Sequence, residues 1–362
     1  MQSIENALID KDIIKSVIDN REYNKIIIQY YQKFAEEFHD NYKNTLQNKS
    51  FNISNCNKYW LLDKYEQQRI KDLKKQNLCR DKFCSNCKKV KQSARMARYI
   101  PELEQYKGKL YHLTLTVPNC SGQALKDTIN HMSKCFRKLI TYIRCDKNMN
   151  VKGIDFSSWG YEGAVRSLEV TFNRDDYHPH FHVGLILDPN LLSRKDIVNT
   201  YSYDFRKSVP ELKRLFSHQE ILIQKIWYLL INSIRVNKKN IDSLNEGYSC
   251  TMDKFLEGDY AELFKYITKE KDDDGHILSY DNFKTLYEAL YRLKQIQGYG
   301  CLYRINDDFN LEEYEALYQE FIEKIRKKES PAEVLEKPQE LILDTQYKLI
   351  SRKSYFKYLR SL

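Results

Sequence analysis

Three histidines crowd into the five residues from His178 to His182. In an extended strand, side chains two residues apart point to the same face, so His180 and His182 can offer two imidazoles to one ion while Phe181 faces the core. His178 precedes a proline, and we assign it to a turn rather than to the ligand set. The spacing predicts a metal site on a strand.

A carboxylate completes this site if the histidine strand forms a hairpin with the β-rich segment before it. Residues 164–172 and 181–187 flank a polar turn, and a turn centred between Asp175 and Asp176 sets Glu169 opposite His182. Two imidazoles and one carboxylate with open coordination positions suit Mn²⁺ or Mg²⁺ acting on a phosphoryl oxygen. Histidines that only pack or hydrogen-bond are the alternative.

A second set of reactive side chains lies on a predicted helix over residues 254–269. Glu262, Tyr266 and Lys269 are spaced four and three residues apart, so they share one helical face. Tyr260 falls on a different face, and we interpret it as packing. The chain has 28 tyrosines, so Tyr266 gains significance only in combination with the histidine pair.

At these residues the chain resembles a known family. His180-Phe181-His182 inside an apolar strand is similar to the motif of HUH endonucleases, and the flanking sequence resembles single-tyrosine initiators of rolling-circle plasmid replication. Residues 113–119 (LTLTVPN) are similar to that family's first motif, a central strand of its sheet, and residues 262–269 match its third motif. The resemblance covers about residues 79–304, and both ends of the chain lie outside its specific motifs.

The resemblance implies roles for individual residues. Tyr266 would be the nucleophile that nicks one strand of the plasmid origin, leaving a 5′-phosphotyrosine link and a 3′-OH primer, and Glu262 would be the general base of the later closing step. Lys265 or Lys269 could add positive charge to the same phosphate. The implied partners are single-stranded or hairpin origin DNA, a host helicase and a host DNA polymerase.

A cysteine cluster lies upstream of these motifs. Cys79, Cys84 and Cys87 supply three thiolates at the spacing of a zinc knuckle, and Cys56 is the natural fourth ligand for a structural Zn²⁺. Initiators of this type often carry a similar element, so the resemblance supports zinc. Reduced cysteines without metal are the alternative.

The positive charge of the chain is concentrated around this cluster. Residues 64–109 hold 14 Lys or Arg against 5 Asp or Glu, which equals the whole formal charge of +9. A cationic block of this kind is typical of proteins that bind a polyanion. The residues that we expect to contact origin phosphates from a helix after the cluster are Lys88, Lys89, Lys91, Arg95 and Arg98.

Length and composition limit the class of protein. A chain of 362 residues with 42% hydrophobic content can bury a core, and its longest apolar runs, such as residues 226–231, are too short to span a membrane. Nine cysteines, with three between Cys79 and Cys87, suit metal binding in a reducing compartment better than disulfides. We therefore expect a cytoplasmic protein without membrane contact. A monomer and a dimer both remain open.

Periodicity predicts an α+β fold with an antiparallel HUH-type sheet flanked by helices. Four regions are expected: an N-terminal helical region (1–55), a cysteine-rich basic zinc element (56–100), the nicking domain (101–305) and a C-terminal helical region (306–362). Helical patterns are read over residues 12–38, 65–76, 90–99, 125–143, 210–236, 254–269 and 311–325, and strand patterns over 110–117, 164–172, 181–187 and 299–304. Residues 41–57 are read as a loop.

Two other functions share parts of this pattern. A related HUH transposase or relaxase would have the same histidine pair, although the segment from Glu262 to Lys269 argues against it. An origin-binding repressor would leave the metal face or Tyr266 idle. A covalent protein–DNA adduct separates these hypotheses, because a repressor only shifts DNA in a gel.

Overall fold

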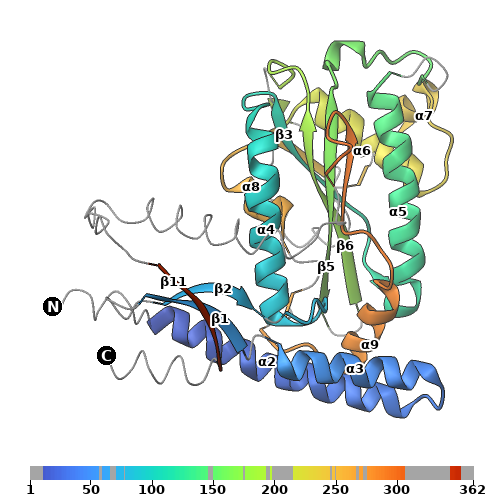
Figure 1. Ribbon diagram of the computed structural model, residues 1–362. Helices are drawn as coiled ribbons and strands as arrows, with labels where there is room; N and C mark the ends of the chain where they lie inside the picture. Colours follow the sequence, from blue (N-terminus) through green and yellow to red (C-terminus); the bar gives the residue numbers. More distant parts are fainter. Residues whose placement is uncertain are drawn as a thin grey trace. The chain divides into compact units, whose positions relative to one another are not determined.

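The computed structural model describes residues 11–56, 59–65, 71–76, 78–145, 150–173, 176–192, 196–197, 215–244, 247–248, 250–265, 269–271, 275–305 and 343–351. The chain divides into two compact units (Figure 1). The first unit combines Met1–Arg98 with Asn310–Leu362, and the second is Tyr99–Phe309. Among the described helices, none has the length and apolar character that a membrane span requires.

The first unit contains a helical pair and a small antiparallel sheet. Helices α2 (Lys11–Glu36) and α3 (Asn41–Asn55) pack against each other, with Ile27 and Leu46 fully buried. The sheet has the order β11-β1-β2 and consists of β1 (Tyr59–Tyr65), β2 (Lys71–Gln76) and β11 (Leu343–Ser351). Helix α4 (Ser85–Glu104) begins in this unit and continues into the second.

Helix α3 replaces the loop that the sequence predicted over residues 41–57. The Asp40 carboxylate accepts a hydrogen bond from the Tyr42 backbone N–H and so caps the helix. Only Leu46, Ser50 and Ile53 are buried, at spacings of four and three. This narrow apolar stripe among Asn, Lys and Ser residues hid the helical period, so the loop prediction was wrong.

Two further predictions for the first unit were wrong. Residues 65–76 were predicted to form a charged helix, but β1 and β2 pair there, with Asp63 opposite Asp72. Residues 306–362 were predicted to be helical, but within this region Leu343–Ser351 is a strand that pairs with β1, which is remote in sequence. Such long-range pairing overrides local propensity. The helix predicted over residues 311–325 lies outside the described residues.

The second unit is built on a six-stranded antiparallel sheet, which confirms the predicted α+β class. Its strand order is β10-β5-β6-β3-β9, and a short β4 pairs with β6 off this path. The strands are β3 (Leu110–Thr116), β4 (Cys120–Ser121), β5 (Gly163–Asn173), β6 (Asp176–Ile186), β9 (Cys250–Lys254) and β10 (Ile296–Gly300). The histidine strand β6 is therefore central, between β5 and β3.

Helices cover the sheet face that carries Phe181. Helix α5 (Gly122–Ile143) brings Phe136 to 5.7 Å between ring centroids from Phe181, and α6 (His218–Ile231) places Trp227 against the same ring. The Trp227 indole donates to the Thr116 carbonyl at 2.8 Å. The remaining elements of this unit are η1 (Ser157–Trp159), β7 (Asp196–Ile197), β8 (Leu215–Phe216), α7 (Lys238–Ser243), α8 (Asp259–Leu263) and α9 (Tyr280–Ala289).

The register of the β5–β6 hairpin differs from the predicted one. Glu169 pairs with His180, not with His182, because the strands close with Asn173 opposite Asp176. This register pairs the buried aromatic rings of Phe172 and Tyr177 across the strands. A shift of two residues preserves the facing of side chains, so Glu169 stays on the histidine face.

The helix predicted over residues 254–269 is much shorter in the structure. Residues up to Lys254 belong to β9, which pairs with β3, and α8 ends at Leu263, after which Phe264 has φ −103° and ψ 12°. Pairing of β9 with β3 therefore keeps the start of the predicted helix in the sheet. Residues 266–268, and with them Tyr266, lie outside the described residues.

Candidate functional site

The adjacent strands β5 and β6 bring one carboxylate and two imidazoles together. The Oε2 atom of Glu169 lies 3.0 Å from the Nε2 atom of His180 and 3.0 Å from the Nε2 atom of His182. The donor atoms of all three side chains lie within 4.8 Å of one another. His180 and Glu169 are cross-strand neighbours, and His182 follows on the same face of β6. This geometry allows one ion to contact all three groups.

In both His180 and His182, the Nδ1 atom makes a hydrogen bond that fixes the orientation of the imidazole ring. The Nδ1–H of His180 donates to the His178 carbonyl at 3.2 Å. Nδ1 of His182 lies 3.2 Å from Nε2 of His112, whose Nδ1 lies 3.0 Å from a carboxylate oxygen of Asp259. Since Asp259 accepts from His112, the Nε2 of His112 can accept the Nδ1–H of His182. Both ligand histidines then present the Nε2 lone pair toward Glu169.

This arrangement fits a divalent cation. Three electron pairs, from Glu169 and the two Nε2 atoms, converge on one point and repel one another unless a positive charge lies between them. When no ion is bound, the two Nε2 atoms can instead carry protons and donate to the carboxylate. Burial by itself would raise the pKa of Glu169, but these hydrogen bonds with His180 and His182, and the charges of His180 and Lys265, bring that pKa below its ordinary value. The carboxylate is therefore ionised at neutral pH and available as a ligand.

The sequence analysis missed His112 and Asp259. His112 lies on β3 opposite Gly184, so it shares the histidine face of the sheet. The alternation of His112, Thr114 and Thr116 in LYHLTLT carried that signal, because these are the half-buried positions of the strand. Asp259 opens α8, and nothing in its local sequence indicates a histidine partner.

Helix α8 lies over the histidine face (Figure 1) because Gly184 has no side chain. A Cβ atom at Gly184 would lie 3.5 Å from Leu263 and 3.2 Å from Val165. At the end of α8, Glu262 and Lys265 form an ion pair, and the Lys265 carbonyl accepts a hydrogen bond from the Gln295 side chain at 2.7 Å. The chain that leads into Tyr266 is thus fixed up to Lys265.

Two other predicted assignments can be compared with the structure. Tyr260 is 5% exposed and its hydroxyl donates to Glu104 at 2.8 Å, so it packs as expected. Burial, followed by the hydrogen bond to Glu104, raises the pKa of Tyr260 above its ordinary value. Lys269 is exposed. The ring of His178 bonds to Asn119 at 2.7 Å and is not directed at Glu169.

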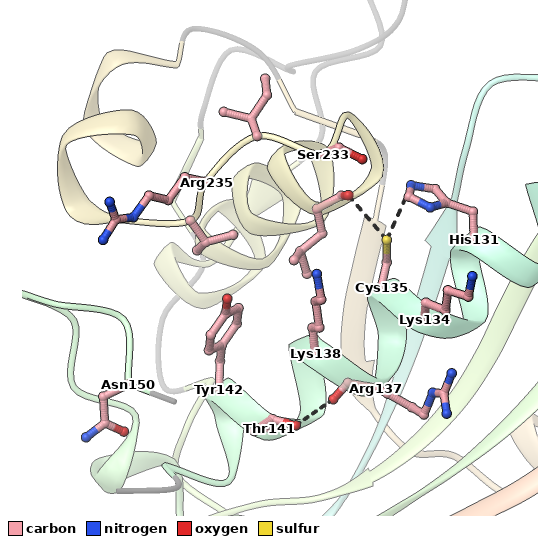
Figure 2. A pocket seen from close by; sticks show the side chains of 13 residues that line it. His131, Lys134, Cys135, Arg137, Lys138, Thr141, Tyr142, Asn150, Ser233 and Arg235 are labelled. Carbon is pink, nitrogen blue, oxygen red and sulfur yellow. Dashed lines mark hydrogen bonds between the residues drawn. The ribbon is translucent and has the colours of Figure 1, made fainter. Parts of the chain in front are cut away.

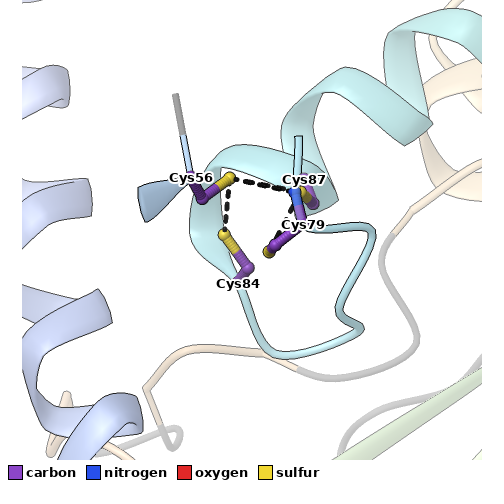
Figure 3. Close-up of side chains that lie close together, drawn as sticks. All are labelled: Cys56, Cys79, Cys84 and Cys87. Carbon is purple, nitrogen blue, oxygen red and sulfur yellow. Dashed lines mark hydrogen bonds between the residues drawn. The ribbon is translucent and has the colours of Figure 1, made fainter. Parts of the chain in front are cut away.

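The four cysteines expected to bind zinc form one cluster (Figure 3). Their Sγ atoms lie within 4.8 Å of one another, with contacts of 3.5 Å from Cys87 to Cys56 and to Cys79, and 3.6 Å from Cys84 to Cys56. Sulfurs of a tetrahedral Zn²⁺ site with Zn–S bonds of about 2.3 Å lie roughly 3.8 Å apart. The cluster therefore fits zinc.

The electrostatics of the cluster also favour a cation. Hydrogen bonds with Cys79, Cys84 and Cys87 lower the pKa of the Cys56 thiol. Hydrogen bonds with Cys56, and then with Cys84, raise the pKa of the Cys79 thiol. Hydrogen bonds with Cys56, Cys79 and Cys84 raise the pKa of the Cys87 thiol. Four thiolates at this distance repel one another, and a bound metal ion would stabilise all four.

Helices α2 and α3 hold the cysteine loop in place. Asn24 accepts a hydrogen bond from the Ser85 backbone and donates to the Cys84 sulfur at 3.5 Å. The buried Asp81 carboxylate accepts from the Tyr31 hydroxyl and from Lys49, the latter at 2.7 Å. The loop is thus positioned by the helical pair before any metal binds.

The basic residues expected to contact DNA are not equally accessible. Lys88 is 5% exposed and its ammonium group lies over the ring of Tyr23, and Arg95 is 2% exposed. Because they are buried, Lys88 and Arg95 cannot contact a DNA phosphate in this conformation. Lys89, Lys91 and Arg98 are half-buried and retain exposed surface.

Comparison with known proteins finds similarity to replication proteins. The family described as Replication protein matches residues 70–202, a range that includes the histidine hairpin and ends before Glu262. A "Protein rep" of Staphylococcus aureus is 32% identical over 178 residues, which cover 46% of this chain and 68% of the relative. No solved structure matches the chain.

Further relatives bear the same name. A "Protein rep" of Streptococcus pneumoniae serotype 2 (strain D39 / NCTC 7466) is 28% identical over 62% of this chain and 61% of the relative. A "Protein rep" of Bacillus sp is 26% identical over 80% of this chain and 84% of the relative.

Proposed function

Because the chain belongs to this family of replication proteins, we propose that it is a plasmid replication initiator that nicks one strand of its origin DNA by tyrosine transesterification. The observation that supports this most strongly is the group of Glu169, His180 and His182, in which both imidazoles are oriented from behind. These three residues leave coordination positions open for a phosphate oxygen.

The three ligands would hold Mn²⁺ or Mg²⁺, which when bound supplies a Lewis acid for a phosphoryl oxygen. The Tyr266 hydroxyl would attack the phosphorus and release its proton to solvent while a 5′-phosphotyrosine bond forms. The bond from phosphorus to the 3′ oxygen breaks, and that oxygen takes up a proton from solvent to give the primer hydroxyl. The neighbouring Lys265 supports this role of Tyr266, because its positive charge is one of the groups that lower the pKa of Glu169. The residue next to Tyr266 is therefore within electrostatic reach of the metal face.

The closing step would use Glu262. Its carboxylate is half-exposed and paired with Lys265, so it is both accessible and oriented. As a general base it removes the proton from the attacking 3′-OH or water, and that oxygen displaces the tyrosine oxygen from phosphorus. Lys265 and Lys269 would neutralise charge on the same phosphate.

The remaining parts of the proposal concern partners. The four-cysteine cluster would hold a structural Zn²⁺, and the accessible Lys89, Lys91 and Arg98 would contact phosphates of the origin DNA. Single-stranded or hairpin DNA is the expected substrate, because attack needs an accessible phosphate. A host helicase and a host DNA polymerase would continue replication from the 3′-OH.

Incubation with single-stranded DNA from the origin of its own replicon tests the proposal. Wild-type protein with Mn²⁺ should give a covalent adduct on a denaturing gel, and Tyr266→Phe should give none while still binding DNA. An adduct that forms equally well in Tyr266→Phe would reject this nucleophile. No adduct from wild-type protein that binds the DNA would instead favour an origin-binding repressor, and nicking confined to transposon or transfer-origin DNA would favour a transposase or relaxase.

A further inference from the structure

A hollow of about 850 Å³ lies between α5 and the segment that follows α6 (Figure 2). Because α5 and α6 cover the sheet face of Phe181, this pocket belongs to the layer opposite the histidine face. Its lining includes Lys134, Arg137 and Lys138 from α5 and Arg235 after α6. Among the described residues that line it, none is acidic and none has a role in the proposed nicking reaction.

The cations of this pocket are exposed and lack ion-pair partners within the described part of the chain. On the exposed surface of α5, Lys134 is three residues from Arg137 and four from Lys138, so it has a like-charged neighbour on either side. Such neighbours disfavour an isolated helix. A negatively charged ligand that lies along this face would offset the repulsion.

The pocket is held by hydrogen bonds between its two helices. The His131 ring bonds to the Ile231 carbonyl at 2.8 Å, and the Cys135 thiol donates to the Leu230 carbonyl at 3.2 Å. Figure 2 shows the bond from Cys135 to the Leu230 carbonyl and the contact between Cys135 and His131. The spacing of the cations on α5 and after α6 is therefore set by the fold rather than by a ligand.

The arrangement of the charges favours an extended ligand. Lys138 and Tyr142 project from α5 toward the segment after α6, whereas Arg137 and Arg235 point away to opposite sides (Figure 2). From Lys134 to Thr141 the helix rises on the order of 10 Å, which is longer than one phosphate group. We propose that this pocket binds the sugar–phosphate backbone of duplex DNA, at a place separate from the nicking site. The hydroxyl of Ser233 adds a hydrogen-bond donor for a phosphate oxygen.

The proposal is tested by the salt dependence of binding to a short duplex of unrelated sequence, followed by fluorescence anisotropy without Mn²⁺ or Mg²⁺. In Arg137→Ala/Lys138→Ala and in Arg235→Ala, the slope of log K against log salt should fall by about 0.9 for each phosphate that the variant no longer neutralises. Lys126→Ala removes an exposed cation of α5 outside the pocket and should keep the wild-type slope. Failure of the nicking proposal would not alter this result, because neither an adduct nor a divalent ion is required.

Two results would overturn the proposal. Slopes and affinities equal to wild type in both pocket variants would show that no phosphate is bound there, and would leave an acidic protein surface as the ligand to test. Displacement of the duplex by inorganic phosphate at matched ionic strength, seen in wild type and abolished in Arg137→Ala/Lys138→Ala, would assign the pocket to a single free anion.

Discussion

His112 acts on the proposed metal through His182. Burial lowers the pKa of His112 despite the nearby Asp259, so the ring is neutral and its Nε2 can accept the Nδ1–H of His182. His112→Ala removes this acceptor, and we expect Mn²⁺ affinity to fall about 10- to 100-fold, as is usual when the partner of a ligating histidine is removed. Isothermal titration calorimetry measures the change directly.

His178→Ala is the matched control for that experiment. Its ring bonds to Asn119, and its hydrogen bond with His180 uses the backbone carbonyl, which the substitution keeps. Mn²⁺ affinity should stay at the wild-type level. Equal decreases in His112→Ala and His178→Ala would mean that the relay from Asp259 does not orient His182.

Tyr260 gives a prediction for alkaline pH. Its pKa is raised by burial and then by Glu104, so the unfolded chain loses the phenolic proton more readily than the folded one. The contribution of Tyr260 to the free energy of unfolding is complete below the ordinary tyrosine pKa, near 10. It is lost as the pH rises from there through the pKa of Tyr260 in the folded protein. Tyr260→Phe should therefore lose less stability between about pH 9 and 11 than wild type in urea titrations. Identical pH slopes would contradict the assignment.

At the scale of elements, Gly184 controls how closely α8 approaches β6. Gly184→Leu would crowd Val165 and Leu263, and overpacking of this kind typically costs about 1–3 kcal/mol. We expect nicking to fall on the order of 100-fold if α8 is displaced by an ångström. Mn²⁺ affinity should fall much less, because Glu169, His180 and His182 lie on the sheet. A plasmid-origin nicking assay and calorimetry together make this comparison.

Gly258→Ala is the control for this substitution. Among the described residues, no atom lies within 4 Å of a Cβ at Gly258, and its φ of −65° suits any residue, so nicking should be unchanged. Full activity of Gly184→Leu would show that the position of α8 does not matter for the reaction.

The elements differ in how far their sequence predicted them. Strands β3, β5 and β6 follow clear period-two patterns. The predicted register was wrong by two residues, but Glu169 still lies on the predicted face because side chains alternate between faces with a period of two. The relation of His112 to His182 depends on β3 lying beside β6, a long-range pairing that no local pattern contains. The same limit explains why β11 was missed and why the helix predicted over residues 254–269 was too long.

At the scale of the whole molecule, the two units depend on different groups for their stability. Cys56, Cys79, Cys84 and Cys87 all belong to the first unit, and structural Zn²⁺ contributes on the order of 10 kcal/mol in small domains. Cys84→Ser should release one zinc ion per chain and abolish the thermal transition of that unit, while the transition of the second unit remains. Elemental analysis with differential scanning calorimetry measures both.

Cys301→Ser is the control for the zinc prediction, because Cys301 is exposed and lies in the second unit. It should retain both the zinc and the transitions. Wild-type protein without zinc, or a Cys84→Ser variant with an intact first transition, would show that the cysteine cluster does not stabilise the unit through a metal.

The most direct test of the whole account is to identify the residue that carries DNA after the reaction. Wild-type protein is incubated with Mn²⁺ and origin single-stranded DNA, digested with nuclease and protease, and analysed by mass spectrometry. We expect a nucleotide on the peptide that contains Tyr266, and the same adduct in Tyr260→Phe. A nucleotide on any other of the 28 tyrosines would contradict the assignment of Tyr266 as the nucleophile.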